Sequence, residues 1–147
     1  MKTFAILLFS FLMTKGCQTS EKKDMKAAII EYVANTRGFY QKIEIKDNTA
    51  SVSHERSGKE KPTTIVLSKE DSAQLAALLE DIDFEDLKNL KAPTEKRFYD
   101  GAAIANLKIT YKDKTYQSAS FDHGFPPAEI EKIVLKINSF AKQNNEN

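Results

Sequence analysis

The sequence predicts an α+β domain in which an antiparallel β-sheet, built from hairpins, carries two amphipathic helices packed on one face. Three observations predict this class. Alternating apolar residues flank short turns in two parts of the chain, which is typical of hairpins. Two other segments have apolar residues at helical spacing. Strands and helices do not alternate one by one, so a parallel nucleotide-binding sheet is not expected.

The first strands are expected between residues 28 and 67. The apolar residues of segment 28–36 fit a helix face as well as a strand, but tyrosine and the β-branched residues favour a strand. Ile43 and Ile45 alternate in segment 40–46, the period-two pattern of a half-buried strand. Asp47-Asn48 is then a tight turn, because both residues tolerate left-handed backbone angles. Two further strands are expected at residues 49–56 and 63–67.

The first helix is expected to begin after Ser68. Its hydroxyl group caps free amides at the helix start, and Asp71 stands three residues later, as in a capping box. The core-facing stripe consists of Leu75, Leu78, Leu79 and Ile82. A short further helical turn is expected at residues 84–90.

The second half of the chain repeats the combination of hairpin and helix. Residues 103–112 and 115–121 are expected to pair through a turn at Asp113-Lys114. Residues 124–127 (GFPP) then start the last helix, since proline suits a first helical turn. Its buried face consists of Ile130, Ile133, Val134, Ile137 and Phe140.

The N-terminus has the pattern of a signal peptide. Lys2 supplies the basic start, and residues 4–13 (FAILLFSFLM) form an uncharged apolar run. A membrane-spanning helix needs roughly 20 apolar residues, so this run is too short to span. We expect residues 1–16 to be the signal peptide.

Gly16-Cys17 resembles the lipobox of bacterial lipoproteins, in which a small residue precedes a lipid-bearing cysteine. Thr14 and Lys15 depart from the usual aliphatic and small residues. The resemblance implies a diacylglycerol on Cys17 and a third chain, such as palmitate, on its amine. It places the protein in the cell envelope, on the outer membrane, with its body on the periplasmic or surface face. An ordinary secretory signal with a chance cysteine is the alternative.

The remainder is expected to divide into three parts. Residues 17–27 are the lipidated cysteine and a polar tether, 28–142 are a single domain, and 143–147 are a frayed tail. Without Lys2 and Lys15, 20 basic residues face 21 acidic ones, a formal charge of −1. A nucleic-acid partner is therefore not expected.

No chemical motif indicates an enzyme, and no metal or other cofactor is expected. The two histidines, His54 and His123, could join Asp122 in a zinc site only if their hairpins met, and His54 also fits the edge of the core. A Ser-His-Asp set with Ser118 or Ser120 has poor geometry, because adjacent strand side chains point apart. The acidic run at Asp81, Asp83, Glu85 and Asp86 is more typical of a solvated helix end than of a catalytic pair.

The strongest candidate for an interaction surface combines RFYDGA (97–102) with FDHGFPP (121–127). Both segments should lie at one end of the last hairpin, with Arg97 paired to Asp100 or Asp122. The rings of Phe98, Tyr99, Phe121 and Phe125 would form an aromatic floor. The surface residues are Arg97, Phe98, Tyr99, Asp100, Asp122, His123 and Phe125. The alternative is structural: an aspartate that holds a loop and aromatic rings that plug the sheet end.

Four segments carry a further resemblance: TRGFYQKIEI, SGKEKP, KAPTEKRFYDGAAIANLKITY and SFDHGFPPAEIEKIV. In these the chain resembles small lipoproteins of Bacteroidota-type bacteria that have no assigned activity. The resemblance therefore implies no activity. The expected anchor and the aromatic segments predict a lipid-anchored, non-catalytic binding module with the membrane and an envelope protein as partners. The order of elements, including Asp83-Phe84 at a helix end and the later "PP", is also similar to emfourin-type inhibitors of metalloproteases. That layout makes an envelope protease inhibitor the alternative function.

Overall fold

The structure is a computed structural model that describes residues 22–143. The expected signal peptide, Cys17 and the end of the tail lie outside these residues. The described part forms one α+β domain around a seven-stranded antiparallel sheet, as the sequence predicts. The strands are β1 (Ala28–Thr36), β2 (Phe39–Lys46), β3 (Thr49–Ser53), β4 (Thr63–Val66), β5 (Ile104–Tyr111), β6 (Lys114–Gln117) and β7 (Phe121–Asp122).

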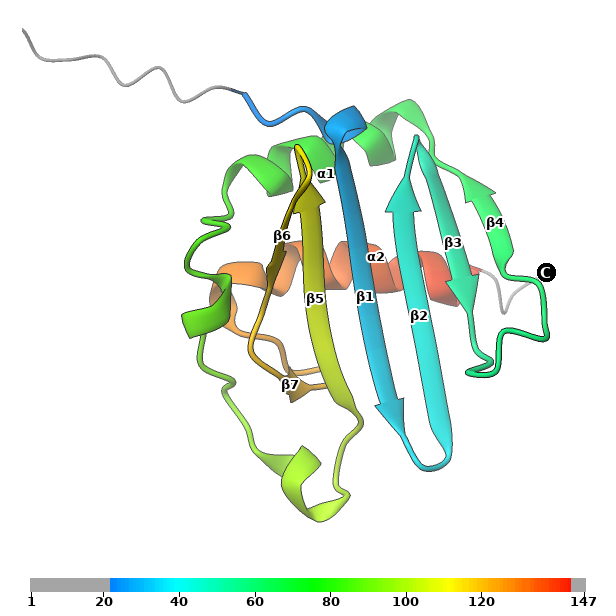
Figure 1. The fold of residues 1–147 in the computed structure, drawn as a ribbon, viewed down its shortest axis with the longest axis vertical. Helices are drawn as coiled ribbons and strands as arrows, with labels where there is room; N and C mark the ends of the chain where they lie inside the picture. The colour runs from blue at the N-terminus through cyan, green and yellow to red at the C-terminus, as the bar shows by residue number, and fades with distance from the viewer. Residues whose placement is uncertain (1–21, 144–147) are drawn as a thin grey trace, which may run out of the picture.

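The sheet has the order β4-β3-β2-β1-β5-β6, and the short strand β7 pairs with β5 beyond the end of β6 (Figure 1). Strand β1 is central because it pairs with β2 on one side and with β5 on the other. In this register Tyr32 lies between Ile43 and Leu107, and all three side chains are buried. The alternation of apolar and polar residues therefore gives the sheet one buried face.

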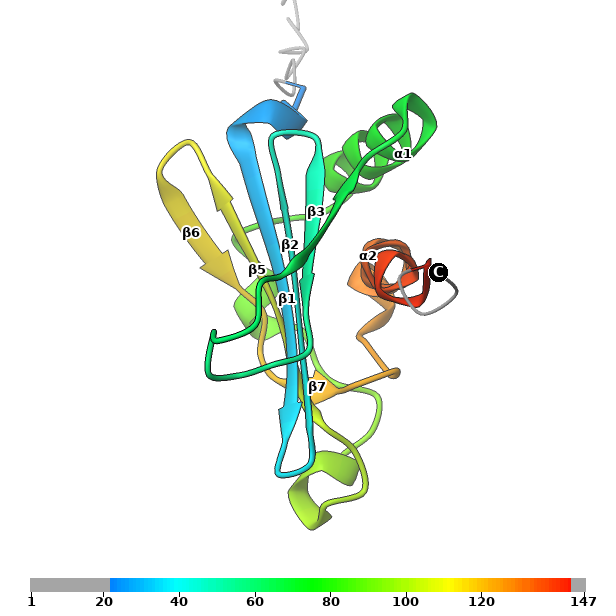
Figure 2. The ribbon, with the colours of Figure 1, turned by 90° about the vertical axis from the view of Figure 1, so that its right-hand side faces the viewer.

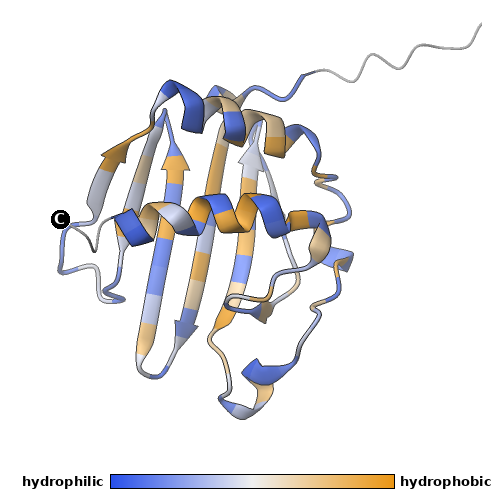
Figure 3. Cartoon of the chain, turned by 180° about the vertical axis from the view of Figure 1, so that it is seen from behind, coloured by the Kyte–Doolittle hydropathy of each residue, from blue (hydrophilic) through white to orange (hydrophobic). Residues whose placement is uncertain are grey.

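Two α-helices cover the buried face. Helix α1 (Lys69–Glu80) buries Leu75 and Leu79, and helix α2 (Glu131–Gln143) buries Ile133, Val134, Ile137, Phe140 and Ala141. Both helices lie on the same side of the sheet (Figure 2) and run across its strands. Seen from that side, α2 lies over the apolar bands of the central strands (Figure 3).

Capping residues set the start of α1 where the sequence predicts it. The hydroxyl of Ser68 accepts the backbone N–H of Asp71 at 3.0 Å and donates to its carboxylate at 2.8 Å. Helix α2 follows Pro127 and a single 3₁₀ turn, η4 (Ala128–Ile130). Another 3₁₀ turn, η2 (Leu87–Asn89), forms the short helical segment expected between residues 84 and 90.

The other face of the sheet is open and polar. At its centre Glu31 pairs with Lys42 on β2 at 2.7 Å and with Lys108 on β5 at 2.5 Å. Burial raises the pKa of the Glu31 carboxyl group, but the hydrogen bonds and charges of these two lysines outweigh this effect and lower it. The carboxylate is thus held between strands by two cations.

The last hairpin differs from the prediction in two ways. The turn residues are Lys112 and Asp113, both with positive φ, one position before the expected Asp113-Lys114. The returning strand is not continuous, because Ser118 interrupts the ladder between β6 and β7. Its hydroxyl accepts the Leu107 N–H at 3.0 Å in place of a backbone carbonyl. This cross-strand hydrogen bond to a side chain replaces one bond of the regular strand pairing.

The strand expected at residues 49–56 also ends early, at Ser53. The Glu55 carboxylate accepts the backbone N–H groups of Ser57 and Lys59, at 2.7 and 2.9 Å, and so closes a loop. His54 is exposed and not at the core edge.

The segment before β1 contacts the domain. A 3₁₀ turn, η1 (Met25–Ala27), follows Asp24. The ammonium group of Lys23 donates to the carbonyl groups of Leu79 at 3.1 Å, Glu80 at 3.0 Å and Ile82 at 2.5 Å. Lys23, which the sequence assigns to the tether, therefore caps the C-terminal end of α1.

Candidate functional site

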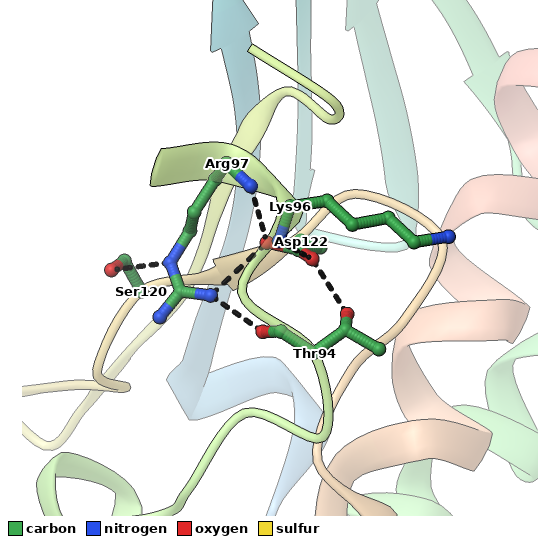
Figure 4. A network of polar contacts seen from close by, with 5 residues as sticks. All are labelled: Thr94, Lys96, Arg97, Ser120 and Asp122. Carbon is green, nitrogen blue, oxygen red and sulfur yellow. Dashed lines mark hydrogen bonds and ion pairs between the residues drawn. The ribbon is translucent and has the colours of Figure 1, made fainter. Parts of the chain in front are cut away.

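The two segments singled out in the sequence meet at one end of the sheet through Asp122. This carboxylate is fully buried. It accepts hydrogen bonds from the Thr94 hydroxyl at 2.6 Å and from the backbone N–H groups of Lys96 at 2.7 Å and Arg97 at 3.0 Å (Figure 4). A residue of β7 thereby holds the whole segment that leads into the 3₁₀ turn η3 (Lys96–Tyr99).

The side chain of Arg97 completes this set of contacts around Asp122, which we call the staple. Its guanidinium group lies 3.0 Å from the Asp122 carboxylate and donates to the Thr94 carbonyl at 2.7 Å and to Ser120 Oγ at 3.3 Å. Of the two partners left open for Arg97, Asp122 is the one that it contacts. Both side chains are buried, with 8% and 0% of their surface exposed. A buried charge pair persists only with such additional hydrogen bonds.

The electrostatics of Asp122 follow from these contacts. Burial alone raises the pKa of a carboxyl group. The hydrogen bonds from Thr94, Arg97 and Lys96 outweigh burial and lower the pKa of Asp122 from 3.8 to about 2. Asp122 is therefore ionised at neutral pH, and its hydrogen bonds with Thr94, Lys96 and Arg97 stabilise the charged form.

The staple presents exposed rings at the tip of its loop. Phe98 is 70% exposed and Tyr99 is 72% exposed. Asp100 ends η3 in the left-handed conformation, with φ 59°, and the Gly101 N–H donates to the Lys96 carbonyl at 2.8 Å. The loop backbone is thus well bonded, while its large apolar side chains are not buried.

The four rings expected to form one floor separate into two groups. Phe121 is fully buried, and its ring centre lies 6.3 Å from that of Tyr32. It plugs the sheet end, as the structural alternative predicts. Phe98, Tyr99 and Phe125 are exposed, and the first and last of these carry cations: Arg97 lies 4.3 Å from the Phe98 ring and Lys96 4.5 Å from that of Phe125.

Two exposed residues from other strands extend the surface. Ile104, 46% exposed, pairs with Asp122 in the β5–β7 register. Phe39, 37% exposed, starts β2 and lies 5.2 Å, ring to ring, from His123. Among the described residues, five of the seven exposed large hydrophobic side chains thus lie at this end of the sheet. Phe39 is on its helix face, with Gln41, and Ile104 is on its open face, with Lys108. We call this end of the domain the apolar end; its members are Phe39, Phe98, Tyr99, Ile104 and Phe125.

Sequence reasoning misses Phe39 and Ile104 because they belong to different hairpins. Each residue begins a strand, beside a turn or a loop. Exposed apolar residues without a function also occur at such positions, so the sequence does not mark these two as functional. Only the pairing of β1 with both β2 and β5 brings them to the same end of the sheet.

His123 points away from the staple. Its Nδ1 atom lies 2.7 Å from the hydroxyl of buried Tyr32, on the helix side of the sheet. The turn that carries it is closed by the Phe125 N–H, which donates to the Asp122 carbonyl at 2.8 Å, and Gly124 has φ +89°. This positive angle suits the glycine position of a type II turn. Neighbouring Asp122 and His123 therefore serve different sites.

The other chemical candidates are not assembled in residues 22–143. No group of three or more His, Cys, Asp and Glu side chains in this part of the chain could hold a metal ion. The acidic residues between positions 81 and 86 are all exposed. Within the same residues no helix has the length and apolar character needed to cross a membrane.

Comparisons with known proteins add nothing to the description of the site, which therefore rests on its geometry. No protein-family model matches the chain, and neither the curated proteins nor the solved structures include one similar to it.

Proposed function

We propose that the chain is a lipid-anchored cell-envelope protein, attached through Cys17 after removal of the signal peptide, that binds a protein partner without catalysis through its apolar end. The observation that carries the proposal is the exposure of Phe98 and Tyr99 on a loop that buried Asp122 holds in place. Rings that stay exposed to water do not add the stability that burial of apolar surface gives a folded protein. Binding gains from rigid aromatic residues that are ordered in advance.

The position of the apolar end supports this function. Strand β1 begins beside η1, where the chain from Cys17 enters, and runs nine residues to Thr36 near the apolar end (Figure 1). At about 3.3 Å per residue this places the two ends roughly 26 Å apart. A body tethered at η1 would therefore present its apolar end away from the bilayer, toward other envelope proteins.

Cation–π pairs suit a partner with an apolar centre and acidic edges. Arg97 and Lys96 lie over Phe98 and Phe125. Aromatic and arginine side chains supply most of the energy at protein interfaces. The expected partner surface is therefore an apolar pocket rimmed by carboxylates.

Two experiments test the proposal. The mass of the N-terminal peptide from native membranes should show acyl groups on Cys17, and an unmodified thiol would contradict the anchor. In a pull-down from those membranes, Tyr99→Ala should lose a partner that Thr115→Ala, an exposed change on β6, retains. Equal recovery by both variants would contradict the binding surface.

The stapled loop also fits the second candidate, inhibition of an envelope metalloprotease, because inhibitors of proteases bind with little change of shape. This function predicts that an excess of the protein blocks peptide cleavage by a thermolysin-like enzyme. Undiminished cleavage would remove it.

A further inference from the structure

A hollow of about 200 Å³ lies between α2 and the edge of the apolar end. Its apolar walls come from Pro126, Val134, Leu135 and Ala141, and its polar side chains are those of Gln41, His123, Asn138 and Lys142. Gln41 is a core-facing residue of β2 with only 7% of its surface exposed. Buried polar groups normally have partners, so their hydrogen bonds indicate what the hollow offers a ligand.

A backbone carbonyl fixes the orientation of Gln41. The Asn138 Nδ2 group donates to the Val134 carbonyl at 2.9 Å, so Asn138 Oδ1 faces the other way. That oxygen accepts the Gln41 Nε2 group at 2.6 Å. Gln41 Oε1 has no hydrogen-bond partner among the described residues. Every fully enclosed side-chain oxygen in these residues does have a partner, so Gln41 Oε1 is not fully enclosed. An acceptor is therefore open to the hollow.

The second polar group of the hollow, the His123 imidazole, contacts the Tyr32 hydroxyl. Burial raises the pKa of Tyr32 well above its ordinary value, so the phenol keeps its proton. Burial lowers the pKa of His123, so the imidazole is neutral at pH 7. The site requires the tautomer in which the phenol donates to Nδ1, 2.7 Å away, and the imidazole proton resides on Nε2. His123 thus adds a donor beside the acceptor of Gln41.

From this arrangement we infer that the hollow is a second binding site, for a secondary amide that carries a branched aliphatic group. The ligand N–H donates to Gln41 Oε1, and its C=O accepts from His123 Nε2–H. The aliphatic group packs against Val134, Leu135 and Ala141. The amide can belong to a leucine-like residue of a peptide or to a small free amide, since both offer the same groups.

The size of the hollow agrees with this ligand. A cavity of about 150 Å³ holds a benzene molecule. The observed space of about 200 Å³ accommodates a somewhat larger group, such as a leucine side chain with its peptide unit.

The test uses N-acetyl-leucinamide as the probe, added to the full chain labelled with ¹⁵N. Backbone signals of residues around the hollow should shift with a dissociation constant on the order of 1 mM, as expected for so small a ligand. N-acetyl-glycinamide, which lacks the aliphatic group, should bind about tenfold more weakly or not at all. A leucine-containing peptide that shifts the same signals more strongly would assign the site to peptides.

Two variants and a control test the contacts. Gln41→Leu removes the acceptor and should weaken binding about fivefold or more. Leu135→Ser tests the apolar wall at an exposed position, where folding is insensitive, and should also weaken binding. Val66→Ser, at an exposed apolar position on β4, should not change it.

Three results would overturn the inference. These are equal binding of the two acetyl amides, no shift near the hollow with N-acetyl-leucinamide, and shifts that centre on Phe98 and Tyr99. An imidazole ¹⁵N spectrum adds an independent check that does not depend on folding of a variant. His123 protonated on Nδ1 would remove the donor that the site requires.

Discussion

Arg97 and Asp122 form a buried ion pair, with 3.0 Å between guanidinium nitrogen and carboxylate oxygen, that joins the η3 loop to strand β7. The pair lies at the end of the sheet that carries five exposed apolar side chains. Order in the loop and exposure of its rings thus have separate causes, and each can be tested separately.

Asp122→Asn should destabilise the protein, because an amide in this position cannot accept all the hydrogen bonds of Thr94, Lys96 and Arg97. Breaking one partner of a buried pair costs about 3–5 kcal/mol. Urea unfolding measures the free energy. Asp100→Asn, an exposed control in the same loop, should change it by less than about 0.5 kcal/mol. Similar values for both variants would show that the staple contributes nothing.

The same carboxylate predicts a dependence on pH. The pKa of Asp122 is lowered to about 2 in the folded protein, against an ordinary value of about 3.9 in the unfolded chain. Its contribution is thus complete above about pH 4 and is lost as the pH falls toward 2. The difference in unfolding free energy between wild type and Asp122→Asn should shrink over that interval. A difference that stays constant would contradict the ionised state.

Phe98→Ala should leave stability nearly unchanged, because the ring is 70% exposed. The expected change is below about 1 kcal/mol, or a few degrees in Tm. Phe121→Ala, which empties a fully buried site, should cost about 3–5 kcal/mol. Thermal unfolding of both variants compares them. Comparable losses would mean that Phe98 is a structural plug.

Lys23→Ala should weaken the end of α1, since the ammonium group caps three carbonyl groups there. The expected loss is about 1 kcal/mol. Amide hydrogen exchange in the last turn of α1 should accelerate. Lys22→Ala, its exposed neighbour, is the control, and equal exchange in the two variants would contradict the cap.

Local chemistry allowed much of the fold to be predicted. Ser68 and Asp71 mark a helix start through bonds within four residues, and Ile43 and Ile45 mark a strand by alternation alone. The turn at Lys112-Asp113 is shifted from its prediction, because Asp113 suits either of two adjacent registers.

The site could be predicted only in part, because it depends on contacts between distant residues. Asp122 follows a phenylalanine and precedes His-Gly, so it has the sequence of a turn residue, and its burial arises from a loop more than 20 residues earlier. The sequence allows Arg97 to pair with either Asp100 or Asp122 and does not decide between them. The contacts of Gln41 with Asn138 and of Tyr32 with His123 span more than 90 residues, and no local pattern indicates them.

The central claim is that the stapled loop is the contact point for an envelope partner. Photo-crosslinking in native membranes from a reactive residue at position 99 tests it most directly, with position 115 on β6 as the control. We predict a discrete crosslinked product from position 99 that position 115 does not give and that Asp122→Asn abolishes. No product from position 99, or the same products from both positions, would contradict the claim.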